Sequence, residues 1–239
     1  MNFSDIYFKL RCIIFTRRCR YCKTVVDVRK DVCPQCENEI FKIYGDICFR
    51  CGCSLKECTC KKKASLYARV CAPYYYKGAA KRAVTRLKFY NDPYMAETLA
   101  QDMAECFKTH YGEMDFDICT FVPSHKAEIK NRGYNQAQLL AEKLSEILGI
   151  PCKPLLYKTI PTKPQHTLDE TMRAGNLLGS IVINPEFETK LQDTRILLCD
   201  DVKTTGATLN ECTKTLLING AAEVDCIAVC VAHKEKKEL

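Results

Sequence analysis

The run from Arg195 to Thr208 constrains the fold more than any other part of the chain. Ile196 to Cys199 are consecutive apolar residues, which is typical of a short strand buried on both faces. Two adjacent carboxylates follow, and then a turn of hydroxyl residues and one glycine. Apolar residues next recur at helical spacing, as far as a stop at Asn219-Gly220. The run therefore predicts a strand, an acidic pair, a turn and a helix, in that order.

This order of elements suits an anionic sugar ligand. At the N-terminus of a helix, the backbone N–H groups and Thr hydroxyls of the turn stabilise an anion. Carboxylates at the C-terminal end of a strand lie where open α/β sheets bind ligands, and they can hold a sugar diol or Mg²⁺. A ligand with a phosphate, ribose hydroxyls and a metal-bound tail would use all of these groups. The simpler alternative is an ordinary turn with an acidic helix cap.

The same run resembles the motif with which type I phosphoribosyltransferases bind 5-phosphoribosyl-1-pyrophosphate (PRPP): an apolar strand followed by Asp-Asp-x-x-Thr-Thr-Gly-x-Thr. The resemblance implies that Asp200 and Asp201 hold the 2′- and 3′-hydroxyls of the ribose, with Mg²⁺ bound alongside PRPP. It also implies that the residues of the turn cradle the 5′-phosphate: Thr204, Thr205, Gly206, Ala207 and Thr208. Lys203 departs from the motif, because an apolar or aromatic residue is common there, and it either reaches the phosphate or faces solvent.

The cysteines are concentrated at the N-terminus, where the first 63 residues hold ten of the eighteen. We expect no secretory signal, because Asp5, Lys9 and Arg11 interrupt any apolar region. We also expect no membrane span, since no run approaches the ~20 apolar residues that one needs. Closely spaced cysteine pairs in a chain without an export signal indicate metal sites in the reducing cytoplasm rather than disulfides.

Two sets of four cysteines predict two zinc sites. The first set consists of two Cys-x2-Cys pairs, which match the tetrahedral ligand spacing of a zinc ribbon: Cys19, Cys22, Cys33 and Cys36. The second set is less regular, and its predicted ligands are Cys48, Cys51, Cys58 and Cys60. Cys12 and Cys53 are then left free. Spacing alone leaves two alternatives open: cross-braced pairing between the sets, and cysteines that bind no metal.

Charge follows the same division of the chain. The first 63 residues hold 14 Lys and Arg against 7 Asp and Glu, whereas the rest of the chain is balanced. Each zinc bound by four thiolates carries a formal −2, so two sites would leave this segment only modestly basic. We predict a cysteine-rich zinc-binding domain over residues 1–63, ending in a run of three lysines, and a second domain over residues 64–239.

Strands and helices alternate along the second domain. Residues 66–76 are rich in β-formers, and helices are predicted at Gly78–Phe89 and Pro93–Thr109. A strand over residues 116–123, a helix that carries Leu140 and Leu144, and a last strand over residues 223–232 complete the pattern. This alternation predicts an α/β domain with a mainly parallel sheet flanked by helices, and the PRPP motif places it in the type I phosphoribosyltransferase-like class.

A more specific resemblance covers nearly the whole chain. Val122-Pro123 followed by the run from Arg132 to Ala137 (Arg-Gly-Tyr-Asn-Gln-Ala) is similar to a pattern of the ComF family of competence proteins. The cysteine-rich N-terminus and the run Leu87-Lys88-Phe89 agree with that family. The resemblance implies a role in natural transformation, in which the protein handles single-stranded DNA in the cytoplasm with helicase and recombination partners.

The resemblance also suggests residues for the pyrophosphate. In type I phosphoribosyltransferases the loop after the first core strand binds this group, so Ser124, His125 and Lys126 are candidates. Arg132 is predicted to neutralise the pyrophosphate, and Arg173 is the predicted cation of a lid over residues 159–176. For His125 the alternative is an ordinary surface histidine.

Two functions fit these residues. In the first, Asp200, Asp201 and Arg132 serve phosphoribosyl transfer, in which pyrophosphate leaves C1 of PRPP and an acceptor takes its place. The acceptor and turnover stay open, because the sequence shows neither an evident base nor a nucleobase pocket. In the second, the protein is a non-catalytic adaptor for single-stranded DNA and its partners, and the PRPP site is a sensor or a vestige.

Overall fold

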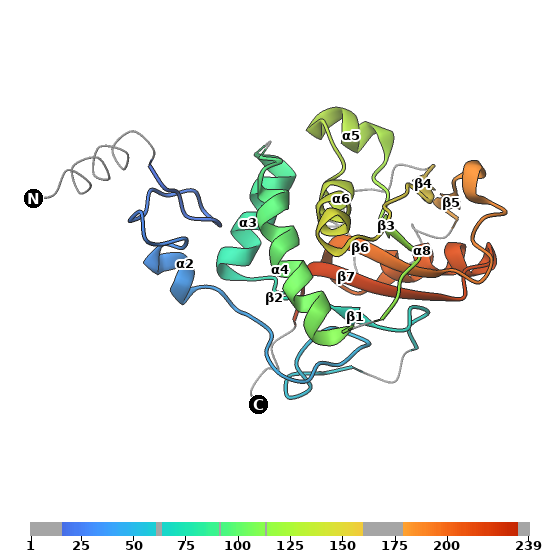
Figure 1. Ribbon diagram of the computed structural model, residues 1–239, viewed down its shortest axis with the longest axis horizontal. Coiled ribbons are helices and arrows are strands. Elements are labelled where there is room, and N and C mark those ends of the chain that lie inside the picture. The colour runs from blue at the N-terminus through green and yellow to red at the C-terminus, as the bar shows by residue number, and fades with distance from the viewer. Residues whose placement is uncertain (1–15, 61–63, 91, 113, 160–178, 234–239) are drawn as a thin grey trace, which may run out of the picture.

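A parallel sheet forms the centre of the molecule in the computed structural model, which describes residues 16–60, 64–90, 92–112, 114–159 and 179–233 (Figure 1). The order of its main strands is β1-β7-β6-β3, and β2 also pairs with β7. All of these pairings are parallel. The strands are β1 (Val70–Cys71), β2 (Tyr74–Tyr75), β3 (Ile118–Phe121), β6 (Arg195–Lys203) and β7 (Glu223–Val231).

The central strand β6 is buried on both faces, as its apolar sequence predicts. Leu197 and Cys199 belong to the hydrophobic core under helices α3, α4 and α6. Ile196 and Leu198 point the other way, into a second core that contains Leu209 of α8. Side chains alternate across a strand, so a run of consecutive apolar residues fills both cores at once.

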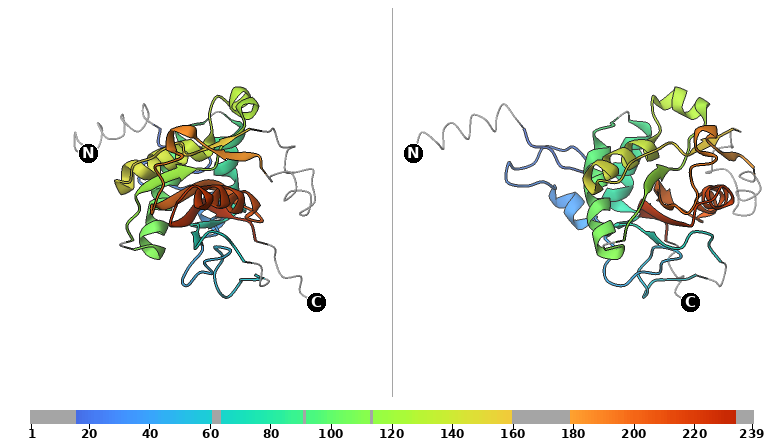
Figure 2. Two further views of the ribbon diagram at one scale, coloured as in Figure 1. Left: turned by 90° about the vertical axis from the view of Figure 1, so that its right-hand side faces the viewer. Right: turned by 45° about the vertical axis from the view of Figure 1, so that its right-hand side comes forward.

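Helices cover both faces of the sheet (Figures 1 and 2). One face is covered by α3 (Gly78–Phe89), α4 (Met95–His110) and α6 (Gln136–Leu148), and the other by α8 (Ala207–Ile218). The predicted bounds of α3 are confirmed, and those of α4 shift by one or two residues. The predicted fold class is therefore confirmed: a mainly parallel sheet flanked by helices, preceded by a cysteine-rich segment.

Three features differ from the sequence-based expectations. The strand β6 continues through Asp200 and Asp201 to Lys203, so the acidic pair lies in the strand and not after it. A separate helix, α5 (Lys126–Arg132), occupies part of the expected loop. A small antiparallel hairpin of β4 (Leu156–Lys158) and β5 (Ile181–Ile183) lies beside the main sheet, and the short 3-10 helix η2 (Pro185–Phe187) follows it.

The cysteine-rich segment packs against the edge of the sheet and the outside of α3 and α4 (Figure 2). It contains the short helix α2 (Pro34–Asn38). The backbone of Tyr75 in β2 donates to the carbonyl of Phe41 at 2.9 Å. Arg20 forms an ion pair with the buried Asp102 of α4 at 2.7 Å. Ile43 and Ile47 share the core of the sheet, so the segment is continuous with the domain that follows.

Within the described ranges, no helix is both long and apolar enough to cross a bilayer. The lead-in segment, Cys12, the lysine run and the predicted lid with Arg173 lie outside the described residues.

Candidate functional site

The C-terminal end of β6 turns directly into α8, as the motif predicts. Thr204 and Thr205 are exposed at this turn, and α8 begins at Ala207. Gly206 adopts φ 84°, the left-handed region that favours glycine. The Thr205 hydroxyl accepts a hydrogen bond from the Ala207 N–H at 3.3 Å. The result is a short turn with two exposed threonines at a helix N-terminus, where an anion is stabilised.

The two carboxylates occupy different environments because neighbouring residues of a strand point to opposite faces. Asp201 is 4% exposed, and its Oδ2 lies 2.8 Å from Nζ of Lys88 on α3. Asp200 lies on the α8 side and its Oδ1 accepts a hydrogen bond from the Asp201 N–H at 2.8 Å. Burial, together with the charge of Asp201, raises the pKa of Asp200 to about 7.

Two lysines flank this acidic pair, and the site prediction did not include them. Burial opposes the charge of Lys88, but the attractions of Asp201 and Asp200 together outweigh it, so the pKa of Lys88 lies above its usual value. Lys158 of β4 lowers the pKa of Asp200 through its charge, and its Nζ lies 3.7 Å from Glu128 Oε2. A signal for Lys88 existed in the run Leu87-Lys88-Phe89, whereas Lys158 comes from a hairpin that the sequence did not predict.

The loop after β3 lies at the same edge of the sheet as the acidic pair. Phe121, the last residue of β3, is in register with Cys199, the residue before Asp200. Ser124 and His125 are partly exposed on this loop. His125 caps α5, because its Nδ1 accepts from the Ala127 N–H at 3.2 Å, and Lys126 is the first, exposed residue of that helix. The loop is therefore shorter than expected, and pyrophosphate binding by these residues stays a prediction.

Arg132 lies at the far end of α5. Its Nη1 donates to Gln136 Oε1 at 3.2 Å, and its guanidinium carbon lies 5.3 Å from the centre of the Phe89 ring. Asn135 joins α6 to β3, since its side chain donates to the Val122 carbonyl at 3.0 Å and accepts from the Ala137 N–H. The run that resembles the ComF pattern therefore fixes the junction of α5, α6 and the strand edge.

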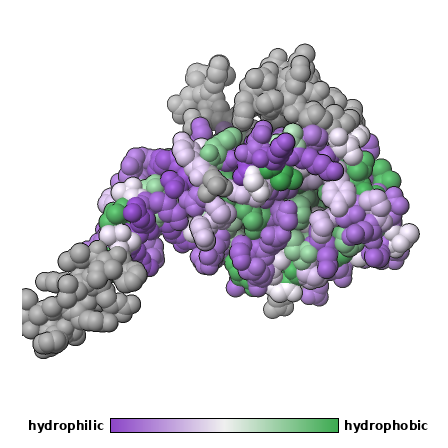
Figure 3. Space-filling view, turned by 90° about the horizontal axis from the view of Figure 1, so that it is seen from above, coloured by the Kyte–Doolittle hydropathy of each residue, from purple (hydrophilic) through white to green (hydrophobic). Residues whose placement is uncertain are grey.

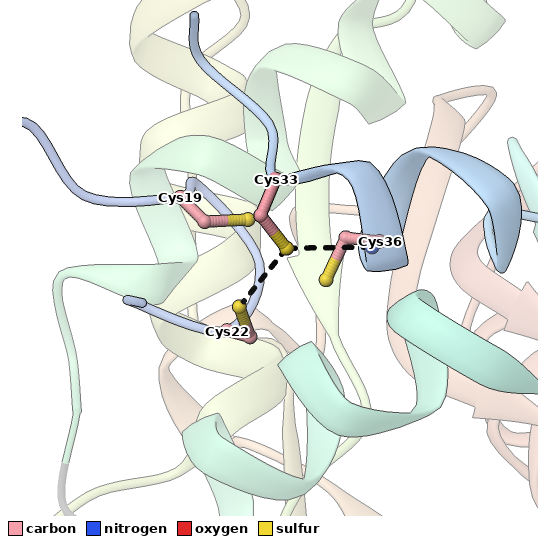
Figure 4. A group of neighbouring side chains, drawn as sticks. All are labelled: Cys19, Cys22, Cys33 and Cys36. Carbon is pink, nitrogen blue, oxygen red and sulfur yellow. Dashed lines mark hydrogen bonds between the residues drawn. The ribbon is translucent and has the colours of Figure 1, made fainter. Parts of the chain in front are cut away.

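The predicted cysteine sets are confirmed as two separate clusters. Within each set, the four sulfur atoms lie within 4.8 Å of one another. The Sγ atoms of Cys22 and Cys33 are 3.6 Å apart, and the first set converges on one point (Figure 4). Four convergent thiolates are the donor set that zinc prefers, so the residues fit the metal. Among the described cysteines, the cross-braced arrangement is not the one adopted.

The loop of the second cysteine cluster contacts the turn between β6 and α8 through Tyr67. The Tyr67 hydroxyl donates to the carbonyl of Arg50, within the cluster loop, at 2.8 Å. A Cβ on Gly206 would approach that same hydroxyl to 3.1 Å. Lys203 is 6% exposed and lies beside Gly206, so of its two alternatives the one in which it faces solvent is wrong. The loop of the second cysteine cluster therefore supports the turn through Tyr67.

The first cluster is tied to α3. The guanidinium of Arg82 donates to Cys36 Sγ at 3.4 Å and pairs with Glu39. An arginine beside a cluster of thiolates offsets their negative charge. Lys88 of the same helix forms an ion pair with Asp201, so α3 contacts both the first cluster and the acidic pair.

Comparison with known proteins identifies the relatives of this chain. No family model matches it. It is 30% identical over 224 residues to competence protein F of Haemophilus influenzae, which covers 88% of this chain and 95% of that protein. The chain belongs to the ComF family. Competence protein ComFC of Bacillus subtilis is 29% identical over 80% of both chains, and DNA utilization protein YhgH of Salmonella typhi is 28% identical over 89% of both.

The solved structures that this chain matches include phosphoribosyltransferases. A purine phosphoribosyltransferase from Pyrococcus horikoshii is 18% identical, with a TM-score of 0.35 over 60% of this chain and 84% of that one. An adenine phosphoribosyltransferase from Thermoanaerobacter pseudethanolicus is 16% identical, with a TM-score of 0.38 over 59% and 83%. These TM-scores are too low to establish a shared fold, and the fold class rests on the sheet topology.

Proposed function

We propose that this ComF-family protein binds PRPP with Mg²⁺ at the end of β6 and serves DNA uptake in natural transformation. The observation that carries the proposal is the acidic pair of β6, joined by a Thr-Thr-Gly turn to the N-terminus of α8. Thr204 to Thr208 would hold the 5′-phosphate, and Asp200 and Asp201 the ribose hydroxyls. The carboxylate oxygens suit Mg²⁺, which prefers hard oxygen ligands.

The cations around this site suit the leaving pyrophosphate. When pyrophosphate departs from C1, negative charge grows on its oxygens, and preorganised cations stabilise it. We propose that Lys126 and Arg132, at the two ends of α5, supply this positive charge, with Arg173, which lies outside the described residues, as a further cation. Bound Mg²⁺ would supply additional charge stabilisation.

We further propose that the two cysteine clusters hold Zn²⁺ and that the protein works in the cytoplasm, where thiols stay reduced. In this proposal residues 1–63 form the zinc-binding unit and residues 64–239 the phosphoribosyltransferase-like unit. The zinc sites would then be structural, since each set supplies four ligands and leaves no open position.

A second function is the alternative proposal: a non-catalytic adaptor that binds single-stranded DNA and helicase or recombination partners. The names of the relatives, competence protein and DNA utilization protein, support a role with DNA and do not choose between the two functions. In the adaptor, PRPP would act as a signal. An enzyme releases pyrophosphate once an acceptor is present, whereas a sensor binds PRPP and leaves it intact.

Calorimetric titration tests the PRPP proposal. PRPP with Mg²⁺ is titrated into the zinc-loaded wild type, Asp200→Asn and the control Asp193→Asn. Asp193 is an exposed carboxylate at a left-handed position (φ 57°) that asparagine also tolerates. We expect binding by the wild type and the control and its loss in Asp200→Asn. Equal binding by all three proteins would remove the ribose site from β6.

A further inference from the structure

Three large aromatic side chains are exposed at the end of α3 and in the short connection to α4. Phe89 is 59% exposed, Tyr90 69% and Tyr94 79%. Scattered exposed aromatics are ordinary, but three within six residues of chain place a large exposed apolar area in one short stretch. Such a surface is typical of an interaction site. Figure 3 views the molecule from the side on which α5 lies.

Contacts on both sides hold this connection in place. Arg86 pairs with Asp92 at 3.1 Å across the turn. The Tyr134 hydroxyl, from the junction of α5 and α6, donates to the Leu87 carbonyl at 2.6 Å. These contacts restrain the backbone that bears the exposed rings. Less conformational entropy of the protein is therefore lost when a ligand binds.

Cations accompany the rings. The guanidinium of Arg132 lies over Phe89, at 5.3 Å from the ring centre. Lys126 and Lys130 are exposed on the same helix, α5. Exposed aromatic rings beside Lys and Arg are the combination with which proteins bind single-stranded nucleic acid, because bases stack on the rings while cations attract the phosphates.

The end of α3 that carries Phe89 also contacts the acidic pair. Lys88, the residue before Phe89, reaches Asp201 at 2.8 Å. A strand that stacks on Phe89 and Tyr90 would therefore pass close to the proposed ribose-phosphate site.

We propose that Phe89, Tyr90, Tyr94 and Arg132 form an aromatic platform that stacks the bases of single-stranded DNA beside the PRPP site. The inference rests on the proposed function, in which the protein handles DNA, and it names the surface that does so. Duplex DNA offers no free base faces, so the platform distinguishes single strands from duplex.

A second aromatic surface in the cysteine-rich segment is the rival location. A cavity of about 830 Å³ is lined there by Phe41, Tyr44, Lys42 and Lys56, among others. Asp46 and Glu57 line it too and offset part of its positive charge. Tyr44 of this cavity is a matched control, because it is 73% exposed and Tyr90 is 69% exposed.

The test is fluorescence anisotropy of a labelled oligo(dT) strand, compared with an abasic strand of the same length. The full-length, zinc-loaded variants are Phe89→Ala/Tyr90→Ala, Phe89→Leu and Tyr44→Ala. We expect the double variant to bind oligo(dT) about tenfold more weakly or worse, since stacking of each base contributes substantially. Phe89→Leu should also weaken binding, because leucine keeps apolar area but has no ring, whereas Tyr44→Ala should bind like the wild type.

Three results would overturn the platform: unchanged affinity in the double variant, a loss confined to Tyr44→Ala, or equal binding of oligo(dT) and the abasic strand by the wild type. Calorimetry with PRPP on the same double variant separates the two proposals. Retained PRPP binding with lost oligo(dT) binding supports both. Lost oligo(dT) binding in a protein whose wild type never binds PRPP would support the platform and remove only the PRPP site.

Discussion

Replacing Asp200 by asparagine should stabilise the ligand-free protein while it removes PRPP binding. Burial and the neighbouring Asp201 raise the pKa of Asp200 from 3.8 to about 7, so the native protein holds a proton there that the unfolded chain releases near neutral pH. An acid with a raised native pKa costs stability as pH rises through that window. Wild-type stability should therefore fall as pH increases from about 4 to about 7 and level off above.

The magnitude follows from the shift. A shift of about three units corresponds to about 4 kcal/mol at pH values above the native pKa. Asparagine has no charge to desolvate, and its side-chain oxygen can still accept the Asp201 N–H, which Asp200 accepts at 2.8 Å. The gain should be about 3 kcal/mol near pH 6 and about 4 kcal/mol near pH 8, as upper estimates.

Urea denaturation of both proteins at these two pH values measures the gain. Asp193→Asn serves as the control, because Asp193 is exposed and its replacement should change the unfolding free energy by less than about 0.5 kcal/mol. If Asp200→Asn is no more stable than the wild type, or if its advantage does not grow with pH, the electrostatic account of the site is wrong.

Three further outcomes are expected. Lys88→Met leaves the buried Asp201 carboxylate without its partner at 2.8 Å and should lower the unfolding free energy by about 2–3 kcal/mol; an unchanged urea midpoint would argue against this ion pair. Elemental analysis should find two zinc ions per chain, and chelation should weaken PRPP binding, because the second cluster supports Gly206 through Tyr67; unaltered PRPP affinity after zinc removal would exclude that support. Arg82→Ala should speed zinc release to a chelator, since it removes the donor to Cys36 Sγ, and an equal release rate would show that this contact is idle.

Local patterns predicted the elements that position the site. The bounds of α3 followed from its helical spacing of apolar residues, and the two four-cysteine sets followed from their spacing. Both are determined by residues that lie close together in the sequence. The turn after β6 was likewise predictable, because Gly206 needs a left-handed backbone and hydroxyl residues precede it.

Contacts between distant segments were the part that the sequence did not reveal. The polar run from Asp200 to Lys203 looked like a loop, but pairing with β7, in which Val202 is in register with Cys230, extends the strand through it. Lys203 is buried for the same reason. Lys158 comes from β4, which pairs with β5 although the two strands are well separated in the sequence. None of these placements has a local sequence signal.

A crystal structure of the zinc-loaded protein grown with PRPP and Mg²⁺ tests the central claim most directly. The account predicts the 5′-phosphate in the turn from Thr204 to Thr208 and the ribose hydroxyls within hydrogen-bond distance of Asp200 and Asp201. PRPP bound elsewhere, or no PRPP at a concentration at which calorimetry shows binding, would contradict it.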